Sequence, residues 1–287
     1  MSPDIPDQSG RTFVITGANS GLGLETVRAL AGAGAHVVLA VRDTDKGAHA
    51  AAGVAGSTEV RELDLADLAS VRKFAESWDH PLDGLVNNAG IMMVAEGRTA
   101  DGFERQFGTN HLGHFALTNL LLPRITDRVV NVSSSLHRGK QLDFDNVNLE
   151  GSYSPTRAYQ QSKLANLLFT AELQRRLSDA GSSVRAEAAH PGYAATNLQS
   201  HHASPLMNKL MWVGNKVLAT SAAEGARPTV YAATQDLPGN VYVGPTKLNQ
   251  TRGAPGPVSR STQARDESAA RRLWDLSEEL TGISWTL

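Results

Sequence analysis

The chain has 287 residues, which allows one large α/β domain or two small ones. Its 27 Lys and Arg against 29 Asp and Glu give a net charge of −2 and a pI near 6.5, so neither nucleic acid nor an anionic membrane surface is an expected partner. The absence of cysteine excludes disulfides, thiolate metal sites, iron–sulfur clusters and a cysteine nucleophile. Residues 1–10 do not form a secretory signal of the usual kind, and no run of about 20 apolar residues predicts a membrane anchor. We therefore expect a soluble, cytoplasmic protein.

Short β-branched runs alternate with longer helical patterns along the chain. The expected strands are residues 12–16, 36–41, 59–63, 82–86, 128–132, 184–189 and 240–243. The expected helices are residues 22–33, 68–78, 101–122, 157–180, 222–234 and 266–280. Most strands are apolar at consecutive positions, which indicates burial on both faces of a sheet. This rhythm predicts an α/β fold of the Rossmann type, with about seven mainly parallel strands in a doubly wound sheet and helices on both faces.

No repeat, low-complexity tract or linker divides the chain. We expect a flexible N-terminal tail over residues 1–10 and a single domain over residues 11–287, with a C-terminal extension from about residue 245. Turn residues dominate residues 249–264, so this segment and the tail should be the least ordered. The apolar stripe of the last helix predicts that it packs back on the body.

Glycines separate the first strand from the first helix in the segment TGANSGLG. Without a Cβ the backbone can approach a pyrophosphate closely, and the helix N-terminus that follows favours its negative charge. The glycine spacing departs from G-x-G-x-x-G, and a tight turn alone would also explain it. The expected contacts to a dinucleotide here are Gly17, Asn19, Ser20, Gly21, Leu22 and Gly23.

The end of the second strand predicts which cofactor is bound. Arg42 follows Val41, and a guanidinium there can pair with the 2′-phosphate of NADP(H). A protein that binds a free 2′-hydroxyl would carry an acid at Val41. NADP(H) is therefore favoured over NAD(H). The alternative is that Arg42 is a solvated charge and that Asp43 holds the ribose.

Further motifs follow in order: NNAG after the fourth strand, Asn110 within GTNHLGHF, Ser134 after the fifth strand, Tyr159-x-x-x-Lys163, and Pro191-Gly192 after the sixth. Together with TGANSGLG they resemble the short-chain dehydrogenase/reductase superfamily over roughly residues 11–243. The segment AYQQSKLANLLFTAEL and residues 136–154 resemble the retinol dehydrogenase and WW-domain oxidoreductase group.

Tyr159 and Lys163 would share one face of a helix, about one turn apart. A free phenol has a pKa of about 10, and a general acid/base works best near the operating pH. A cation about 5 Å away would lower the pKa of the phenol by about two units. We therefore expect the Lys163 ammonium to acidify Tyr159, and the cationic oxidised nicotinamide to act in the same direction.

The resemblance implies a role for each matched position. Tyr159 would be the acid/base, and Lys163 would modulate its pKa and bind the ribose. Ser134 would donate a hydrogen bond to the substrate carbonyl, although either neighbouring serine could take its place. Asn110 would hold a water on the proton path, or it is a buried amide that bends its helix. Further cofactor contacts are implied for Asp64, Leu65, Asn88, Ala89, Gly90, Pro191, Gly192 and Thr196; Asp64 could instead only start a helix.

Two other features carry less weight. His111 and His114 could resemble metal ligands, but no carboxylate supports them, so no metal is expected. Residues 193–220 match the family's mobile substrate flap, and their Met and Trp side chains could cover a lipophilic substrate or belong to an ordinary core.

These observations predict an NADP(H)-dependent oxidoreductase that moves a hydride between nicotinamide and the carbonyl or alcohol of a lipophilic small molecule. The alternatives are a non-catalytic NADP(H)-binding regulatory protein on the same fold, a pigment-type C=C reductase, whose cysteine is missing here, and an extended-branch epimerase. A homodimer or homotetramer built on helices 101–122 and 157–180 is common in the superfamily. The extra residues between Ser134 and Tyr159 could cap that surface and leave a monomer.

Overall fold

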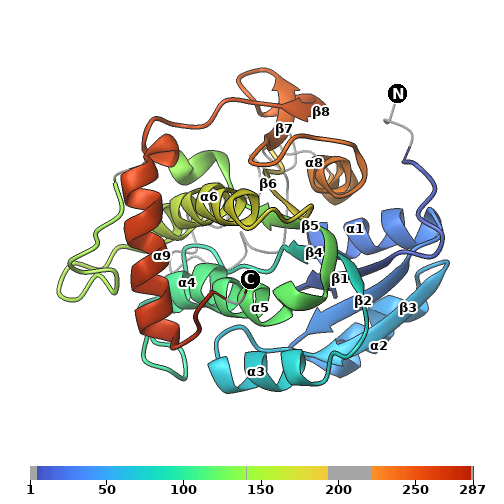
Figure 1. Cartoon of the computed structure of the whole chain (residues 1–287), viewed down its shortest axis with the longest axis horizontal. Coiled ribbons are helices and arrows are strands. Elements are labelled where there is room, and N and C mark those ends of the chain that lie inside the picture. Colours follow the sequence, from blue (N-terminus) through green and yellow to red (C-terminus); the bar gives the residue numbers. More distant parts are fainter. Residues whose placement is uncertain (1–4, 140, 193–220, 286) are drawn as a thin grey trace, which may run out of the picture.

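The computed structural model describes residues 5–139, 141–192, 221–285 and 287. Its centre is a sheet in the order β3-β2-β1-β4-β5-β6-β7-β8 (Figure 1). Strands β1 to β7 are parallel, and β8 runs antiparallel to β7. The chain therefore folds as the Rossmann-type α/β domain that the sequence predicts, with one strand more.

The bounds of the elements agree closely with the sequence pattern for most of the chain. The strands are β1 (Thr12–Thr16), β2 (His36–Val41), β3 (Ser57–Glu62), β4 (Leu82–Asn87), β5 (Ile125–Val132), β6 (Arg185–Ala189), β7 (Tyr242–Lys247) and β8 (Arg252–Pro257). The helices are α1 (Gly21–Gly32), α2 (Thr44–Ala52), α3 (Leu68–Glu76), α4 (Arg105–Phe107), α5 (Gly113–Leu121), α6 (Pro155–Asp179), α8 (Ala222–Thr234) and α9 (Glu267–Thr281).

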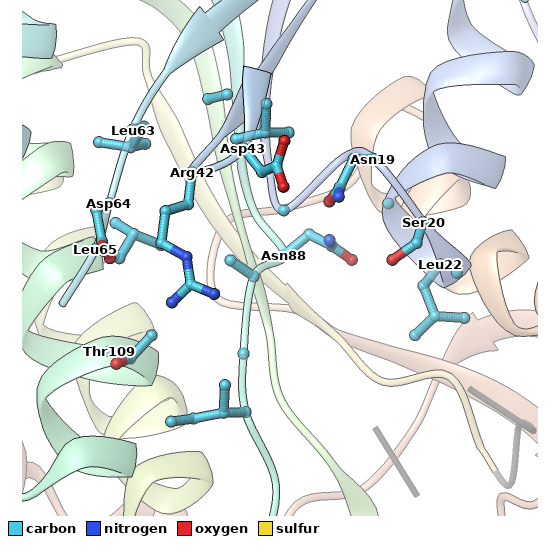
Figure 2. Close-up of a pocket in the computed structure, with 18 of the residues that line it drawn as sticks. Asn19, Ser20, Leu22, Arg42, Asp43, Leu63, Asp64, Leu65, Asn88 and Thr109 are labelled. Atoms are coloured by element: carbon cyan, nitrogen blue, oxygen red, sulfur yellow. The ribbon is translucent and has the colours of Figure 1, made fainter. Parts of the chain in front are cut away.

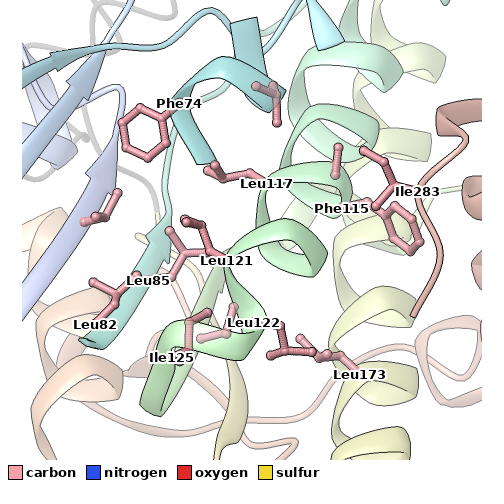
Figure 3. Packing of buried hydrophobic residues seen from close by; sticks show 14 of the residues in the cluster. Phe74, Leu82, Leu85, Phe115, Leu117, Leu121, Leu122, Ile125, Leu173 and Ile283 are labelled. Atoms are coloured by element: carbon pink, nitrogen blue, oxygen red, sulfur yellow. The ribbon is translucent and has the colours of Figure 1, made fainter. Parts of the chain in front are cut away.

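Both faces of the sheet are buried because successive side chains of a strand point to opposite sides. On β1, Phe13 and Ile15 join the core under α1, α2 and α8, whereas Val14 joins the core under α3, α5 and α6. Figure 3 shows the second of these cores, where Leu85 of β4 packs against Leu117 and other side chains of α5. This two-sided burial explains the uninterrupted apolar runs in the strands.

The strand order reverses at β1, which has β2 on one side and β4 on the other. In open α/β sheets a ligand binds at such a reversal, in the crevice beyond the carboxyl ends of the strands. The glycine turn of residues 17–20 leaves β1 at this edge, and Asn88 follows β4 there. The topology thus brings the predicted cofactor residues together.

Four local expectations were wrong or incomplete. Helix α2 was not predicted, because TDKGAHAAA has almost no apolar stripe. The helix expected over residues 101–122 begins at Arg105, and residues Gly108–Leu112 form a π-helical turn before α5. Residues 249–264 contain β8, whose pairing with β7 gives an order that their composition did not predict. In the tail, Gln8 is buried and its N–H donates to Ala33 O at 2.8 Å.

The last helix packs on the body, as its apolar stripe predicts. α9 lies across α5 and α6 (Figure 1), and the Trp274 ring packs edge-on against Phe115 of α5 and close to Phe169 of α6, with ring centroids 5.0 and 5.7 Å away. The Arg176 guanidinium of α6 lies over the same indole at 4.5 Å. The outer face of α5 and α6 is therefore covered by the chain's own C-terminal helix.

Candidate active site

A cavity of about 470 Å³ opens at the carboxyl edge of β1 to β4. Twelve of the predicted cofactor residues line it, namely Gly17, Asn19, Ser20, Gly21, Leu22, Gly23, Arg42, Asp64, Leu65, Asn88, Ala89 and Gly90, whereas Lys163, predicted to bind the ribose, does not. Figure 2 shows these walls, with Asn19 and Ser20 on one side and Asp64 and Leu65 on the other. The cavity has the position and the lining expected of a dinucleotide site.

The glycine turn forms a cradle that side chains would fill. A Cβ on Gly17, whose φ is +63°, would lie 2.9 Å from Ala89 Cα, and a Cβ on Gly23 would lie 2.5 Å from Gly17 O. Ser20 caps α1 without a side-chain hydrogen bond to the helix, and the first turn has no acidic residue. The hydroxyl of Ser20 and the N–H groups of this helix end are therefore suited to a phosphate.

Two cationic side chains follow β2, Arg42 directly after the strand and Lys46 in the first turn of α2. Arg42 is exposed and reaches toward the middle of the cavity, and Asp43 also belongs to the lining (Figure 2). Asp43 caps α2 by accepting from Lys46 N at 3.0 Å and pairs with Lys46 Nζ at 2.7 Å. Its carboxylate is thus engaged by the helix, which weakens the alternative in which Asp43 holds the ribose. Lys46 also lines the cavity.

Asp64 and Asn88 shape the two ends of the adenosine region. Asp64 Oδ1 accepts from Ala66 N at 2.9 Å, so it does stabilise the turn before α3, as the alternative interpretation proposed. Its second carboxylate oxygen is not used in that turn. Asn88 Nδ2 donates to Thr16 O at 2.8 Å, which fixes the end of β1 against the end of β4.

Asn110 and Lys163 meet behind Gly90 of the cavity wall; the predicted catalytic residues Asn110, Ser134, Tyr159 and Lys163 do not themselves line the cavity. A Cβ on Gly90 would lie 3.2 Å from Asn110 Oδ1 and 3.4 Å from Lys163 Nζ. Asn110 Oδ1 accepts from Ile91 N, and its Nδ2 donates to Ile91 O and Ser162 Oγ. Both hydrogens of the side-chain amide are therefore donated to other groups. A water here could bind to Asn110 only by donating a hydrogen bond to its side-chain or main-chain carbonyl oxygen.

The three consecutive serines after β5 have different surroundings. Ser133 is buried, and its Oγ donates to Lys163 O at 2.7 Å, so it is a structural contact to α6. Ser134 is half-buried and hydrogen-bonds to the Tyr159 phenol. The structure therefore favours Ser134 over Ser133 as the hydroxyl beside Tyr159.

Tyr159 and Lys163 do lie on one face of α6, and Lys163 Nζ is 5.8 Å from the centroid of the Tyr159 ring. Burial nevertheless raises the pKa of Tyr159 to about 12, and the Ser134 hydrogen bond offsets only part of this rise. Burial also lowers the pKa of Lys163 to about 8, and its Nζ donates to Val132 O at 3.0 Å. The depression of the phenol pKa that we expected from Lys163 is therefore not seen in the protein alone, where burial raises this pKa and only the Ser134 hydrogen bond lowers it.

Three remaining cofactor predictions fall at or beyond the edge of the described residues. Pro191 and Gly192 follow β6, and the Gly192 N–H donates to His190 Nδ1 at 3.2 Å. Thr196 and the expected flap of residues 193–220 lie outside the described residues.

Sequence reasoning missed several residues of the cavity wall, namely Ala40, Leu63, Lys46, Ile91, Met92, Val94 and Thr109. Lys46 could have been found by its spacing of four residues from Arg42, but only after α2 was recognised. The others belong to strand ends and loops, where no side-chain pattern marks them.

The comparisons with known proteins agree with this site. Residues 11–205 match the family model described as short chain dehydrogenase. The chain belongs to the short-chain dehydrogenase/reductase family. It is therefore an oxidoreductase, and the family uses NAD(P)(H).

Two retinol dehydrogenases are similar in sequence to this chain over almost its whole length. It is 41% identical to retinol dehydrogenase 14 of Mus musculus over 96% of this chain and 86% of the relative. It is 42% identical to retinol dehydrogenase 12 of Homo sapiens over 96% of this chain and 88% of the relative. The predicted resemblance to the retinol dehydrogenase group is confirmed.

Two solved structures extend the comparison. A crystal structure of an uncharacterized protein from Mycobacterium Paratuberculosis is 54% identical, has a TM-score of 0.87, and is matched over 99% of this chain and 98% of that one. A structure from Beutenbergia cavernae described as that of an NAD(P)-dependent gluconate 5-dehydrogenase, with NADP bound at low occupancy, is 26% identical, with a TM-score of 0.60 over 79% of this chain and 90% of that one. In the described part of the dehydrogenase, no helix is both long and apolar enough to cross a membrane.

Proposed function

We propose that this dehydrogenase uses NADP(H) to interconvert an alcohol and a carbonyl in a lipophilic small molecule. The observation that carries the proposal is the position of the Tyr159, Lys163, Asn110 and Ser134 cluster. Asn110 and Lys163 of this cluster lie against Gly90, which lines the cavity together with the glycine cradle. The retinol dehydrogenase relatives and the apolar Ile91, Met92 and Val94 on the wall support a lipophilic substrate.

The residues present fit the dinucleotide. The cradle at Gly17 and Gly23 would receive the pyrophosphate, and Arg42, assisted by Lys46, would pair with the 2′-phosphate. Asp64 would contact the adenine, and Asn88 to Gly90 would line the ribose. When bound, the nicotinamide supplies or accepts the hydride.

The chain's own groups would position the substrate and move the proton. Ser134 would donate a hydrogen bond to the substrate oxygen and hold it beside the Tyr159 phenol. Tyr159 would give its proton to that oxygen in reduction and take it back in oxidation. Lys163 would bind the ribose and, while protonated, favour the phenolate; a positively charged nicotinamide would favour it further.

An assay with a panel of aldehydes, ketones and alcohols, followed by the absorbance of NADPH, tests this function directly. We expect reduction of apolar carbonyls with NADPH and slower reaction with NADH. If the dinucleotide binds but no member of the panel reacts, the non-catalytic NADP(H)-binding protein becomes the better description.

The cytoplasmic location also stays a prediction, which cell fractionation would test.

Arg42→Ala should shift the cofactor preference. Loss of a charge-assisted contact of about 1.5–3 kcal/mol predicts that kcat/KM for NADPH falls about 10- to 100-fold, while kcat/KM for NADH hardly changes. Steady-state kinetics with both cofactors measure this ratio. Arg271→Ala is the control, because Arg271 is an exposed arginine on α9. Equal losses with both cofactors would contradict a role at the 2′-phosphate.

We also expect a monomer in solution. The face of α5 and α6 that would form the family's common dimer is occupied by α9, and His111 Nε2 lies 2.9 Å from Ser277 Oγ across that contact. The segment between Ser134 and Tyr159 contributes Leu142 and Val147 to a second buried cluster, which also contains Leu164 of α6 and Leu273 of α9. Light scattering on a size-exclusion column should give a mass of 30.6 kDa. Twice that mass would mean that another face pairs or that α9 is displaced.

A further inference from the structure

His114 is a buried histidine of α5 with both ring nitrogens engaged. Its Nδ1 lies 3.0 Å from Asn110 O, and its Nε2 lies 2.8 Å from Thr16 Oγ1. Asn110 belongs to the π-helical turn beside Lys163. Thr16 is the last residue of β1 and directly precedes the glycine cradle. His114 therefore lies between the two halves of the site.

The hydroxyl of Thr16 is the branching point of this contact. It accepts from Asn88 N at 3.0 Å and from Ala89 N at 2.9 Å, so both of its lone pairs are used. Its single hydrogen must go to another acceptor. His114 Nε2 is 2.8 Å away, whereas Val86 O is 3.4 Å away, so the hydrogen is donated to the imidazole.

This assignment fixes the tautomer of His114. If Nε2 accepts, the ring proton is on Nδ1, which then donates to Asn110 O. The opposite tautomer would set two acceptors against each other at Asn110 and three donors against the Thr16 oxygen. Burial, with a smaller contribution from the Lys163 charge, lowers the pKa of His114 to about 4, so the ring stays neutral at ordinary pH.

A continuous, directional chain of hydrogen bonds results. The N–H groups of Asn88 and Ala89 donate to Thr16, Thr16 donates to His114, and His114 donates to the carbonyl of Asn110. Asn88 and Ala89 line the dinucleotide cavity. Asn110 belongs to a π-helical turn, an irregularity that is often found at functional sites and that needs external support.

We propose that His114 is a positioning residue that couples the cofactor cradle at Asn88 and Ala89 to the π-turn that carries Asn110. The proposal deepens the proposed function and depends on it for the meaning of the site. Without His114, both the Asn88–Ala89 segment and the π-turn of Asn110 should be less firmly positioned. The cofactor would then bind more weakly, and kcat would fall because Asn110 is displaced from the catalytic cluster.

Three substitutions separate the two ends of the contact. His114→Asn keeps a donor near the position of Nδ1, and His114→Gln can place an acceptor near Nε2, whereas His114→Phe keeps an aromatic ring and loses both. We measure the Kd for NADPH without substrate, kcat with a carbonyl from the panel, and the Tm of each variant. His114→Phe should raise the Kd and lower kcat, each about 5- to 30-fold, the effect of one or two hydrogen bonds.

The conservative variants give the diagnostic pattern. His114→Gln should recover the Kd more than kcat, and His114→Asn should recover kcat more than the Kd. A merely structural role would instead move both constants in parallel with Tm. His111→Phe is the matched control, since His111 is an equally buried histidine whose Nε2 contacts Ser277 of α9; it should lower Tm and leave the Kd unchanged.

A double-mutant cycle on binding completes the test. Thr16→Val should raise the Kd as His114→Phe does, and the two together should add little to either alone, because both break one chain of contacts. Additive effects, or a wild-type Kd and kcat in His114→Phe, would overturn the proposal. Failure of the proposed function is distinguishable, since the binding cycle would still show coupling although no substrate reacts. If His114→Phe does not fold, the Asn and Gln variants decide the matter.

Discussion

Tyr159→Phe should abolish turnover while NADPH still binds within a few fold of the wild type. Phenylalanine keeps the ring that fills this buried position but removes the only phenol oxygen beside Ser134 and Lys163 among the described residues. General acid/base catalysis contributes about 10²- to 10⁴-fold, and the substrate oxygen would also lose a hydrogen-bond partner. The steady-state rate and the NADPH Kd from fluorescence titration measure the two effects separately.

The control is Tyr231→Phe, a tyrosine of α8 on the opposite face of the sheet. It should change neither constant. If Tyr159→Phe keeps more than about a tenth of the wild-type rate, Tyr159 cannot be the main acid/base, because such a group supplies at least about 10²-fold. A large rise in the NADPH Kd would instead indicate that the phenol mainly organises the cofactor site.

The parts of the structure that the sequence predicts well are those where many residues repeat one signal. The inner positions of strands 12–16 and 36–41 are apolar because helices cover both faces of the sheet. The turn that follows leaves no room for a Cβ at residues 17 and 23, and residue 21 has a positive φ that favours glycine. These signals predict the doubly wound sheet and the glycine turn at its carboxyl edge. The cavity residues Asp64, Leu65, Asn88, Ala89 and Gly90 were predicted from the family resemblance instead.

The parts that could not be predicted depend on tertiary contacts. β8 contains two prolines and two glycines and is ordered by its pairing with β7, which no local pattern announces. α2 is short and its only apolar residues are alanines, so Lys46 was missed with it. The pKa of Tyr159 depends on how deeply the phenol is buried, whereas the sequence gives only its spacing from Lys163. In each case the structure depends on contacts with residues that are distant in the sequence.

Glu187 of β6 is a further residue whose pKa depends on tertiary burial, and its titration affects stability rather than catalysis. Its carboxylate is fully buried and neither oxygen accepts a hydrogen bond from the described residues. Arg128 Nη1 is 3.9 Å from Glu187 Oε1, but it donates to Ala232 O and Gln235 O instead. Burial outweighs the attraction of Arg128 and Arg185 and raises the pKa of Glu187 to about 8.

This raised pKa predicts a loss of stability with rising pH. Between about pH 4.5 and 8 the folded carboxyl holds its proton while the unfolded one has released it, so the free energy of unfolding falls across this window and is lowest above pH 8. The difference between 4.5 and about 8 corresponds to roughly 5 kcal/mol as an upper bound. Removing the ionisable group should remove most of this loss.

Glu187→Gln should therefore raise Tm by several degrees at about pH 9 and much less at about pH 5. Glu172→Gln is the matched control, because Glu172 is an equally buried carboxylate that pairs with Arg175 at 2.6 Å and Arg176 at 2.9 Å. It should lower Tm, since the substitution removes the buried anion that Arg175 and Arg176 share and leaves them only the exposed Asp179 and Asp275. Thermal unfolding of both variants across this pH range compares the two directly. A Glu187→Gln variant that is destabilised at high pH would mean that the carboxylate is ionised and paired in the fold, and that Arg128 stabilises it despite its other contacts.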